Sequence, residues 1–147
     1  FGIALACDLV IAKESVRFGC PEINVGVFPF MISALIYRNL PRMVANELMM
    51  FGDLVSAAEG HRLGFVNRVV TDAEFEVETL AWAQRLAAKS PLLMAMGKDA
   101  LAATRDLSLD EALDTLRGRL ALAFSTEDMK EGVAAFQEKR EPQWRRR

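Results

Sequence analysis

The stretch Gly2-Ile-Ala-Leu-Ala-Cys-Asp-Leu-Val-Ile-Ala12, followed by Phe18-Gly-Cys-Pro-Glu-Ile-Asn-Val-Gly26, decides the fold of this chain. The apolar run before Asp8 indicates a short helix, and Asp8 itself favours a turn or capping role. Residues 9–12 are a short apolar run typical of a buried strand. Because proline and glycine punctuate residues 21–30, we expect a structured loop there.

Helical signals dominate the rest of the chain. The apolar run 31–40 ends before Pro41, and a second helix follows Pro41 to about residue 50, where Gly52 stops it. Residues 65–70 are rich in β-branched side chains and predict a strand. Capping sequences of the type Ser/Thr-x-x-Glu begin at Ser56, Thr71 and Ser108. We expect further helices over 57–63, 72–89, 91–105, 109–124 and 127–139.

Composition excludes several classes of protein. The chain has 147 residues, 52% of them hydrophobic, and a net charge of −2, so it is neither disordered nor a strongly basic nucleic-acid binder. Two cysteines and one histidine exclude a disulfide framework and a multi-histidine metal centre. We expect Cys7 and Cys20 to be small core residues. No apolar run reaches the ~18 residues that a membrane span needs.

Glu22 is the acidic residue whose surroundings differ most from an exposed helix face. It lies between Pro21 and Ile23, in an apolar loop with glycine and proline on both sides. A carboxylate in such a place can act as a general base, because desolvation raises its pKa. The structural alternative is a loop glutamate that caps the helix near residue 30 or pairs with an arginine. Local sequence alone leaves both open and favours the structural role.

The C-terminal end is basic. Lys139 and Arg140 follow the last expected helix, and Arg145–Arg147 end the chain. Cations at a helix C-terminus are favoured by the helix dipole alone, and phosphate binding is the functional alternative. We interpret the final arginines as a solvated end rather than a nucleic-acid site.

Five blocks in order resemble the crotonase (enoyl-CoA hydratase/isomerase) superfamily. The two stretches quoted above resemble its "ALACDxxIA" and "FGxPE…G" blocks. The other three blocks are Arg38 with Leu40-Pro-Arg42, the segment 52–70, and Glu131-Gly132 with Ala135-Phe136-Gln-Glu-Lys139-Arg140. The resemblance extends over essentially the whole chain.

This resemblance implies an α/β fold, the C-terminal portion of a crotonase-like ββα spiral followed by a helical trimerisation region. Residues 1–70 would belong to the spiral core, and residues 71–147 to the helical region that assembles subunits and covers the active site. A homotrimer or a dimer of trimers is expected. The backbone N–H donors that hold the enolate oxygen would lie upstream of Phe1, so the 147 residues alone would form an incomplete site.

The resemblance also implies a reaction, which is proton transfer next to a CoA thioester through an enolate. Glu22 matches the catalytic glutamate, and Phe136 and Lys139 match residues that approach CoA. CoA is part of the substrate, and neither a further cofactor nor a metal is expected. An acyl-CoA is the expected small-molecule partner, with no nucleic acid and no membrane. We expect a cytoplasmic or organelle-matrix location.

The chain departs from the family pattern at two places. The first glutamate of the hydratases would fall at position 2, where this chain has Gly2. A Gly-rich stretch is replaced by Phe30-Met-Ile-Ser33, whose bulky groups would reshape the acyl pocket. Both departures argue against efficient simple hydration and favour isomerase-type chemistry by a single glutamate. The alternative is a non-catalytic relative that binds acyl-CoA or partner subunits.

Overall fold

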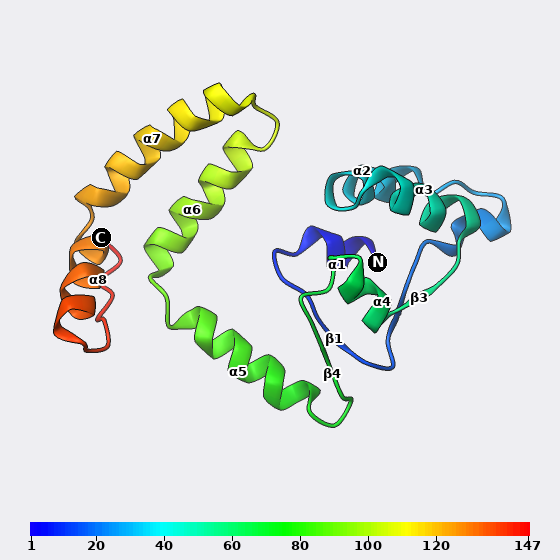
Figure 1. Ribbon diagram of the computed structural model, residues 1–147, viewed down its shortest axis with the longest axis horizontal. Coiled ribbons are helices and arrows are strands. Elements are labelled where there is room, and N and C mark those ends of the chain that lie inside the picture. Colours follow the sequence, from blue (N-terminus) through cyan, green and yellow to red (C-terminus); the bar gives the residue numbers. More distant parts are fainter. The chain divides into compact units, whose positions relative to one another are not determined.

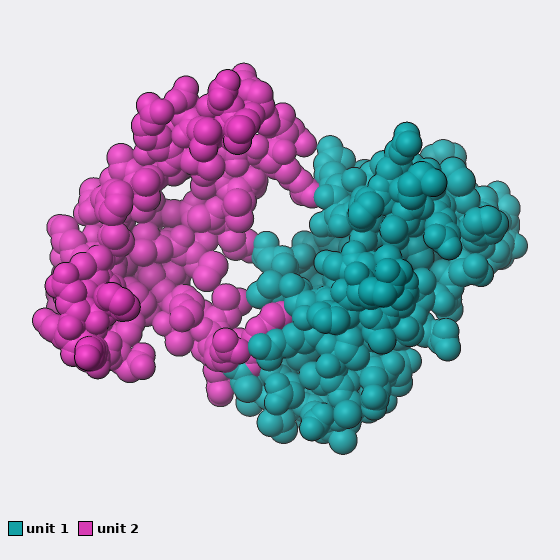
Figure 2. All heavy atoms as spheres, in the orientation of Figure 1, with its two compact units in different colours: residues 1–81 teal, residues 82–147 magenta.

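The computed structural model describes residues 1–147, which divide into two compact units (Figures 1 and 2). Unit 1 comprises Phe1–Ala81 and unit 2 comprises Trp82–Arg147. The chain is mostly helical with four short strands, in agreement with the expected α/β class.

Unit 1 combines short strands with four helices and one 3-10 helix. The strands form two small sheets. β1 (Ile11–Lys13) pairs in parallel with β4 (Arg68–Val70), with Ile11 opposite Arg68. β2 (Arg17–Phe18) pairs antiparallel with β3 (Val55–Ser56), with Phe18 opposite Val55. The first strand begins at Ile11, two residues after the start of the apolar run 9–12 that predicted it. The elements are α1 (Gly2–Ala6), β1 (Ile11–Lys13), β2 (Arg17–Phe18), η1 (Pro21–Val25), α2 (Phe30–Asn39), α3 (Arg42–Phe51), β3 (Val55–Ser56), α4 (Ala57–Arg62) and β4 (Arg68–Val70).

The core of unit 1 lies where η1, α2 and α3 meet the strands. Ile36, Met49 and Cys20 are fully buried there, and burial raises the pKa of the Cys20 thiol. The expectation for Cys20 is therefore confirmed. Cys7 was expected in the core as well, but it is exposed, because α1 ends at Ala6 and its thiol only reaches the carbonyl of Ile3.

Unit 2 contains helices and a C-terminal segment without regular structure, and it has no strand. It contains the end of α5 (Phe75–Ala87), then α6 (Pro91–Thr104), α7 (Leu109–Ser125) and α8 (Glu127–Glu138). Side-chain oxygens cap three of these helices, from Ser90, Ser108 and Thr126. The reciprocal capping box predicted at Ser108 is confirmed, because Glu111 returns a bond to the backbone N–H of Ser108. No helix of the chain is both long and apolar enough to cross a membrane.

Two capping predictions hold only in part. Ser56 accepts a hydrogen bond from the Glu59 N–H, but the Glu59 carboxylate binds Arg62 instead of returning to Ser56. Thr71 and Glu74 bond to each other as predicted, yet α5 begins only at Phe75. For Glu59, the charged partner Arg62 lies within one helical turn and competes for the carboxylate.

Candidate functional site

Glu22 lies on η1, a short 3-10 helix that the flanking proline and glycine define. Pro21 occupies its first turn, and Gly26 closes it in the left-handed region with φ 83°. The Val27 N–H then donates to the Glu22 carbonyl over 3.1 Å. The Asn24 amide donates to the Gly52 carbonyl over 3.3 Å, which fastens η1 to the end of α3.

One carboxylate oxygen of Glu22, Oε2, is buried and has no hydrogen-bond partner. Neither of the structural roles open to this residue is present, because α2 has no side-chain cap and no arginine pairs with Glu22. Buried carboxylate oxygens without a partner are rare, since each costs desolvation free energy that nothing offsets. Burial is the largest cause of the raised pKa of the Cys20 thiol, and the charge of Glu22 is the second. Cys20 therefore stays a thiol.

Gly2 and Ile32 fill one space between α1 and α2. A Cβ at position 2 would lie 3.0 Å from Ile32 Cδ1, which is tighter than ordinary van der Waals contact. Phe30 and Met31, the other bulky residues of this stretch, are mostly exposed, at 74% and 89%. The Ile32 side chain therefore packs where a side chain at position 2 would lie, and Gly2 brings no carboxylate to the position of the first hydratase glutamate.

The two residues expected to approach CoA lie together at the C-terminal end of α8. Phe136 is on the last turn of this helix, with 86% of its surface exposed. Lys139 closes the helix in the left-handed region, with φ 55° and its N–H donated to the Phe136 carbonyl. Its ammonium group is exposed and has no carboxylate partner.

Acidic residues of α8 hold the segment that follows it. Glu131 accepts two bonds from the Arg140 guanidinium and one from the Gln143 N–H, and these hydrogen bonds lower its pKa to about 2. Asp128, fully buried, accepts the Ser90 hydroxyl and the backbone N–H groups of Arg145 and Arg146, which hold its pKa below the usual range. The backbone of Arg145 and Arg146 is therefore fixed, whereas Arg145–Arg147 are exposed to solvent, as the interpretation of a solvated end predicts.

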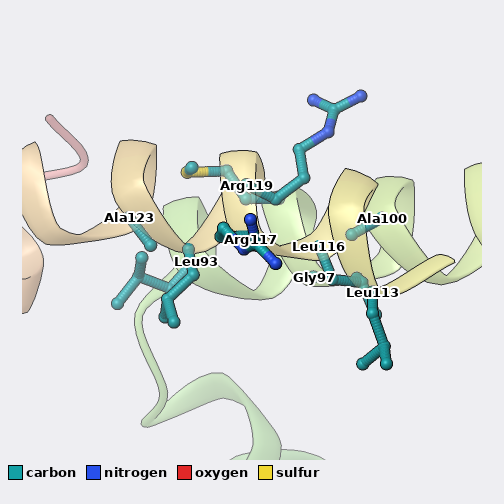
Figure 3. A pocket seen from close by; sticks show the side chains of 10 residues that line it. Leu93, Gly97, Ala100, Leu113, Leu116, Arg117, Arg119 and Ala123 are labelled. Carbon is teal, nitrogen blue, oxygen red and sulfur yellow. The ribbon is translucent and has the colours of Figure 1, made fainter. Parts of the chain in front are cut away.

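An apolar groove of about 600 Å³ runs between α6 and α7 (Figure 3). Both helices contribute to its walls, and Leu113 and Leu120 are more than half exposed. Part of the apolar face of α7 is thus exposed within this chain. No group of three or more His, Cys, Asp or Glu residues is placed to hold a metal ion.

A model of the enoyl-CoA hydratase/isomerase family matches residues 1–147. The chain belongs to this family. It is 38% identical to a probable enoyl-CoA hydratase of Rhizobium meliloti, over 99% of this chain and 57% of the relative. It is 34% identical to a carnitinyl-CoA dehydratase of Proteus mirabilis, over 100% of this chain and 58% of the relative.

A solved enoyl-CoA hydratase structure from Mycobacterium smegmatis has the same fold as this chain. The two superpose with a TM-score of 0.93 at 33% identity, covering 97% of this chain and 56% of that structure. The crotonase fold that the resemblance implied is therefore confirmed for these residues. The chain spans little more than half the length of these hydratase/isomerase relatives.

Three residues were predicted for the site, and they fall in two units. Glu22 belongs to unit 1, whereas Phe136 and Lys139 belong to unit 2, where the end of α8 brings the two together. The residues that fix this end, Asp128 and Glu131, were not predicted as site residues, although Glu131 lies in one of the five blocks quoted above. Their position near a helix N-terminus is typical of exposed acidic residues, so the sequence carries no signal for their bonds to a distant segment.

Proposed function

We propose that the protein carrying this chain is an acyl-CoA enzyme of the hydratase/isomerase type. Glu22 takes a proton from the α carbon, next to the thioester carbonyl, and returns it at the α or the γ carbon, with an enolate between the two steps. The observation that supports this role most is the buried, unpaired Oε2 of Glu22. An oxygen that no other group in the chain binds is available to accept the substrate proton.

We infer isomerase-type chemistry for this single glutamate. Hydration adds a water molecule across a double bond, and two carboxylates that share the water serve this reaction best. Gly2 supplies no carboxylate, and Ile32 Cδ1 lies 3.0 Å from where its Cβ would be. Moving one proton between two carbons needs only one base, so the shift of a carbon–carbon double bond is the reaction that this arrangement favours.

CoA enters the proposed reaction as part of the substrate, with no further cofactor and no metal. Exposed Phe136 would pack on the ligand, and the unpaired Lys139 ammonium would contact its phosphates. We place these residues in the C-terminal part of the whole protein, which would supply the enolate-binding N–H donors from upstream. We also propose a trimer or dimer of trimers in the cytoplasm or an organelle matrix, with assembly covering apolar faces such as the α6–α7 groove.

The test is an assay of the complete protein on 3-enoyl-CoA isomerisation and 2-enoyl-CoA hydration. We expect isomerisation to exceed hydration, and Glu22→Gln to lower kcat for both by about 10²- to 10⁴-fold, as for other general bases. Glu14→Gln, which changes an exposed acidic residue of unit 1, should leave the rates unchanged. Glu22→Gln with wild-type rates would show that Glu22 is not the base.

A second candidate function is a non-catalytic relative that binds acyl-CoA or partner subunits. The absence of a carboxylate at Gly2 and the exposure of Phe30 and Met31 are the observations in its favour. Such a protein would bind acyl-CoA but would leave the protons of the acyl chain in place. The two candidates therefore differ in a single observable, which is proton exchange at the carbon next to the thioester.

A further inference from the structure

Helix α8 ends with a lysine in the left-handed conformation, at a position where glycine is the most common residue. Lys139 has φ 55°, and the Arg140 N–H bonds back to the Ala135 carbonyl over 3.0 Å. These are the left-handed residue and the six-to-one bond of a Schellman helix ending, in which glycine avoids the steric cost that a Cβ brings. A charged side chain held in such a conformation indicates a use for that side chain.

Arg140 binds the two carboxylates that lie nearest to Lys139 along α8. Its guanidinium donates to Glu131 at 2.6 and 3.1 Å, and to Glu138 at 2.6 Å. Glu138 directly precedes Lys139 in the chain, and Glu131 is on the same helix. Arg140 occupies both of these carboxylates. Glu141, the next acidic residue in the chain, offers Arg140 only its backbone carbonyl, and no ion pair joins it to Lys139.

The segment after Arg140 is anchored on its other side as well. Glu131 also accepts the Gln143 N–H at 2.7 Å, and Asp128 accepts the N–H groups of Arg145 and Arg146 at 2.7 and 2.9 Å. The Trp144 indole N–H donates to the Ala88 carbonyl at 2.8 Å. Arg140 therefore lies in a loop whose backbone is fixed at both ends, and its guanidinium is held in one place.

We propose that Arg140 is a positioning residue for anion binding by Lys139. By binding Glu131 and Glu138, it keeps these carboxylates away from the Lys139 ammonium, which stays free for a phosphate of the CoA thioester. This inference rests on the proposed function, since that function supplies the phosphate ligand. Without Arg140, the two carboxylates would compete with the ligand for the same ammonium group.

The test is calorimetric titration of the complete protein with CoA and with pantetheine, which lacks the nucleotide phosphates. We expect Arg140→Met to weaken CoA binding by about three- to tenfold, the scale of one exposed charge contact, and to leave pantetheine binding unchanged. Lys139→Met should have the same effect, and Arg140→Met should add nothing to it. Lys130→Met removes another exposed ion pair of α8, with Glu127, and should change neither ligand.

A rescue variant separates this role from a loss of folding. In Arg140→Met, the further changes Glu131→Gln and Glu138→Gln remove the competing charges, so we expect CoA affinity to return to within about twofold of wild type. Equal weakening of CoA and pantetheine, or no recovery in the rescue variant, would refute the role of Arg140. Neither result depends on turnover, so a failure of Glu22 as the base and a failure of Arg140 are distinguishable.

Discussion

At the scale of single residues, burial rather than residue type distinguishes the acidic side chains. Sequence identified Glu22 because proline, glycine and apolar neighbours surround it, but it left a structural role open. Only the structure shows that neither a helix cap nor an arginine binds this carboxylate. The unpaired oxygen results from tertiary packing around η1, which local sequence does not specify.

Asp128, unlike Glu22, is a buried acidic residue that the sequence did not identify. It is fully buried and accepts three hydrogen bonds from Ser90, Arg145 and Arg146. Its partners lie 38, 17 and 18 residues away along the chain, so no periodicity or capping rule predicts them. A sequence-based reading treats such an acid as an exposed first-turn residue of a helix.

We predict that Asp128→Asn lowers the Tm of the protein by several degrees. The amide NH₂ group can accept no hydrogen bond, so one of the donors that now meet the carboxylate is left unpaired. Thermal denaturation followed by circular dichroism measures this effect. Asp114→Asn, which removes an exposed ion pair with Arg117, is the matched control and should leave the Tm unchanged. Equal Tm values for both variants would contradict the anchoring role of Asp128.

At the scale of elements, the helices were the most predictable features. The ends of α3 and α7 follow local rules, because Gly52 adopts φ 68° after α3 and Ser108 caps α7. The strands were less predictable, since β1 and β4 depend on a pairing between segments 57 residues apart in sequence. The two-residue strands β2 and β3 are too short to show any alternation of side chains.

Gly52 links the end of α3 to the turn that carries Glu22. A Cβ at this position would lie 2.7 Å from Ile23 Cγ2 and 3.0 Å from Asn24 Nδ2, in addition to the strain of φ 68°. We predict that Gly52→Ala destabilises the protein by about 2–4 kcal/mol, of which about 1–2 is backbone strain and the rest overpacking. Denaturant titration measures the free energy of unfolding.

Gly64→Ala is the control for this prediction. Gly64 has φ 89°, but a Cβ there would meet nothing within 4 Å, so only the backbone strain of about 1–2 kcal/mol is expected. If the two variants lost the same free energy, the contact between Gly52 and η1 would be irrelevant to stability. A larger loss of unfolding free energy in Gly52→Ala than in Gly64→Ala, together with reduced activity, would indicate that Gly52 holds the turn carrying Glu22 in place.

At the scale of the whole molecule, the two units differ in what holds them. Unit 1 has a buried apolar core and the aromatic contacts Phe1–Phe65 and Phe18–Phe65. Unit 2 has few fully buried side chains and relies on the acidic anchors of α8. The two helices that form its exposed apolar groove were predictable from sequence. The surface that covers such a groove was not, because the local sequence pattern carries no information about it.

We predict that acid weakens the α8 anchor over a defined pH range. The pKa of Glu131 is about 2 in the folded chain and 4.5 ordinarily, so the ionised group stabilises the fold above pH 4.5. This stabilisation is lost as the pH falls from 4.5 toward 2. Glu131→Gln should therefore be less stable than wild type at neutral pH and should lose less stability in acid.

The measurement is the Tm of both proteins between pH 7 and pH 3. We expect their two curves to converge as the pH falls, because protonation removes from wild type the charge that the variant already lacks. Parallel curves would show that Glu131 is not the group that titrates.

Proton exchange tests the central claim most directly. The complete protein is incubated in D₂O with a saturated acyl-CoA, and deuterium at the carbon next to the thioester carbonyl is measured by mass spectrometry. The account predicts rapid incorporation with wild type, and a loss of about 10²-fold or more in Glu22→Gln with CoA affinity retained. Acyl-CoA binding without deuterium incorporation, or equal incorporation by the Glu22→Gln variant, would contradict it.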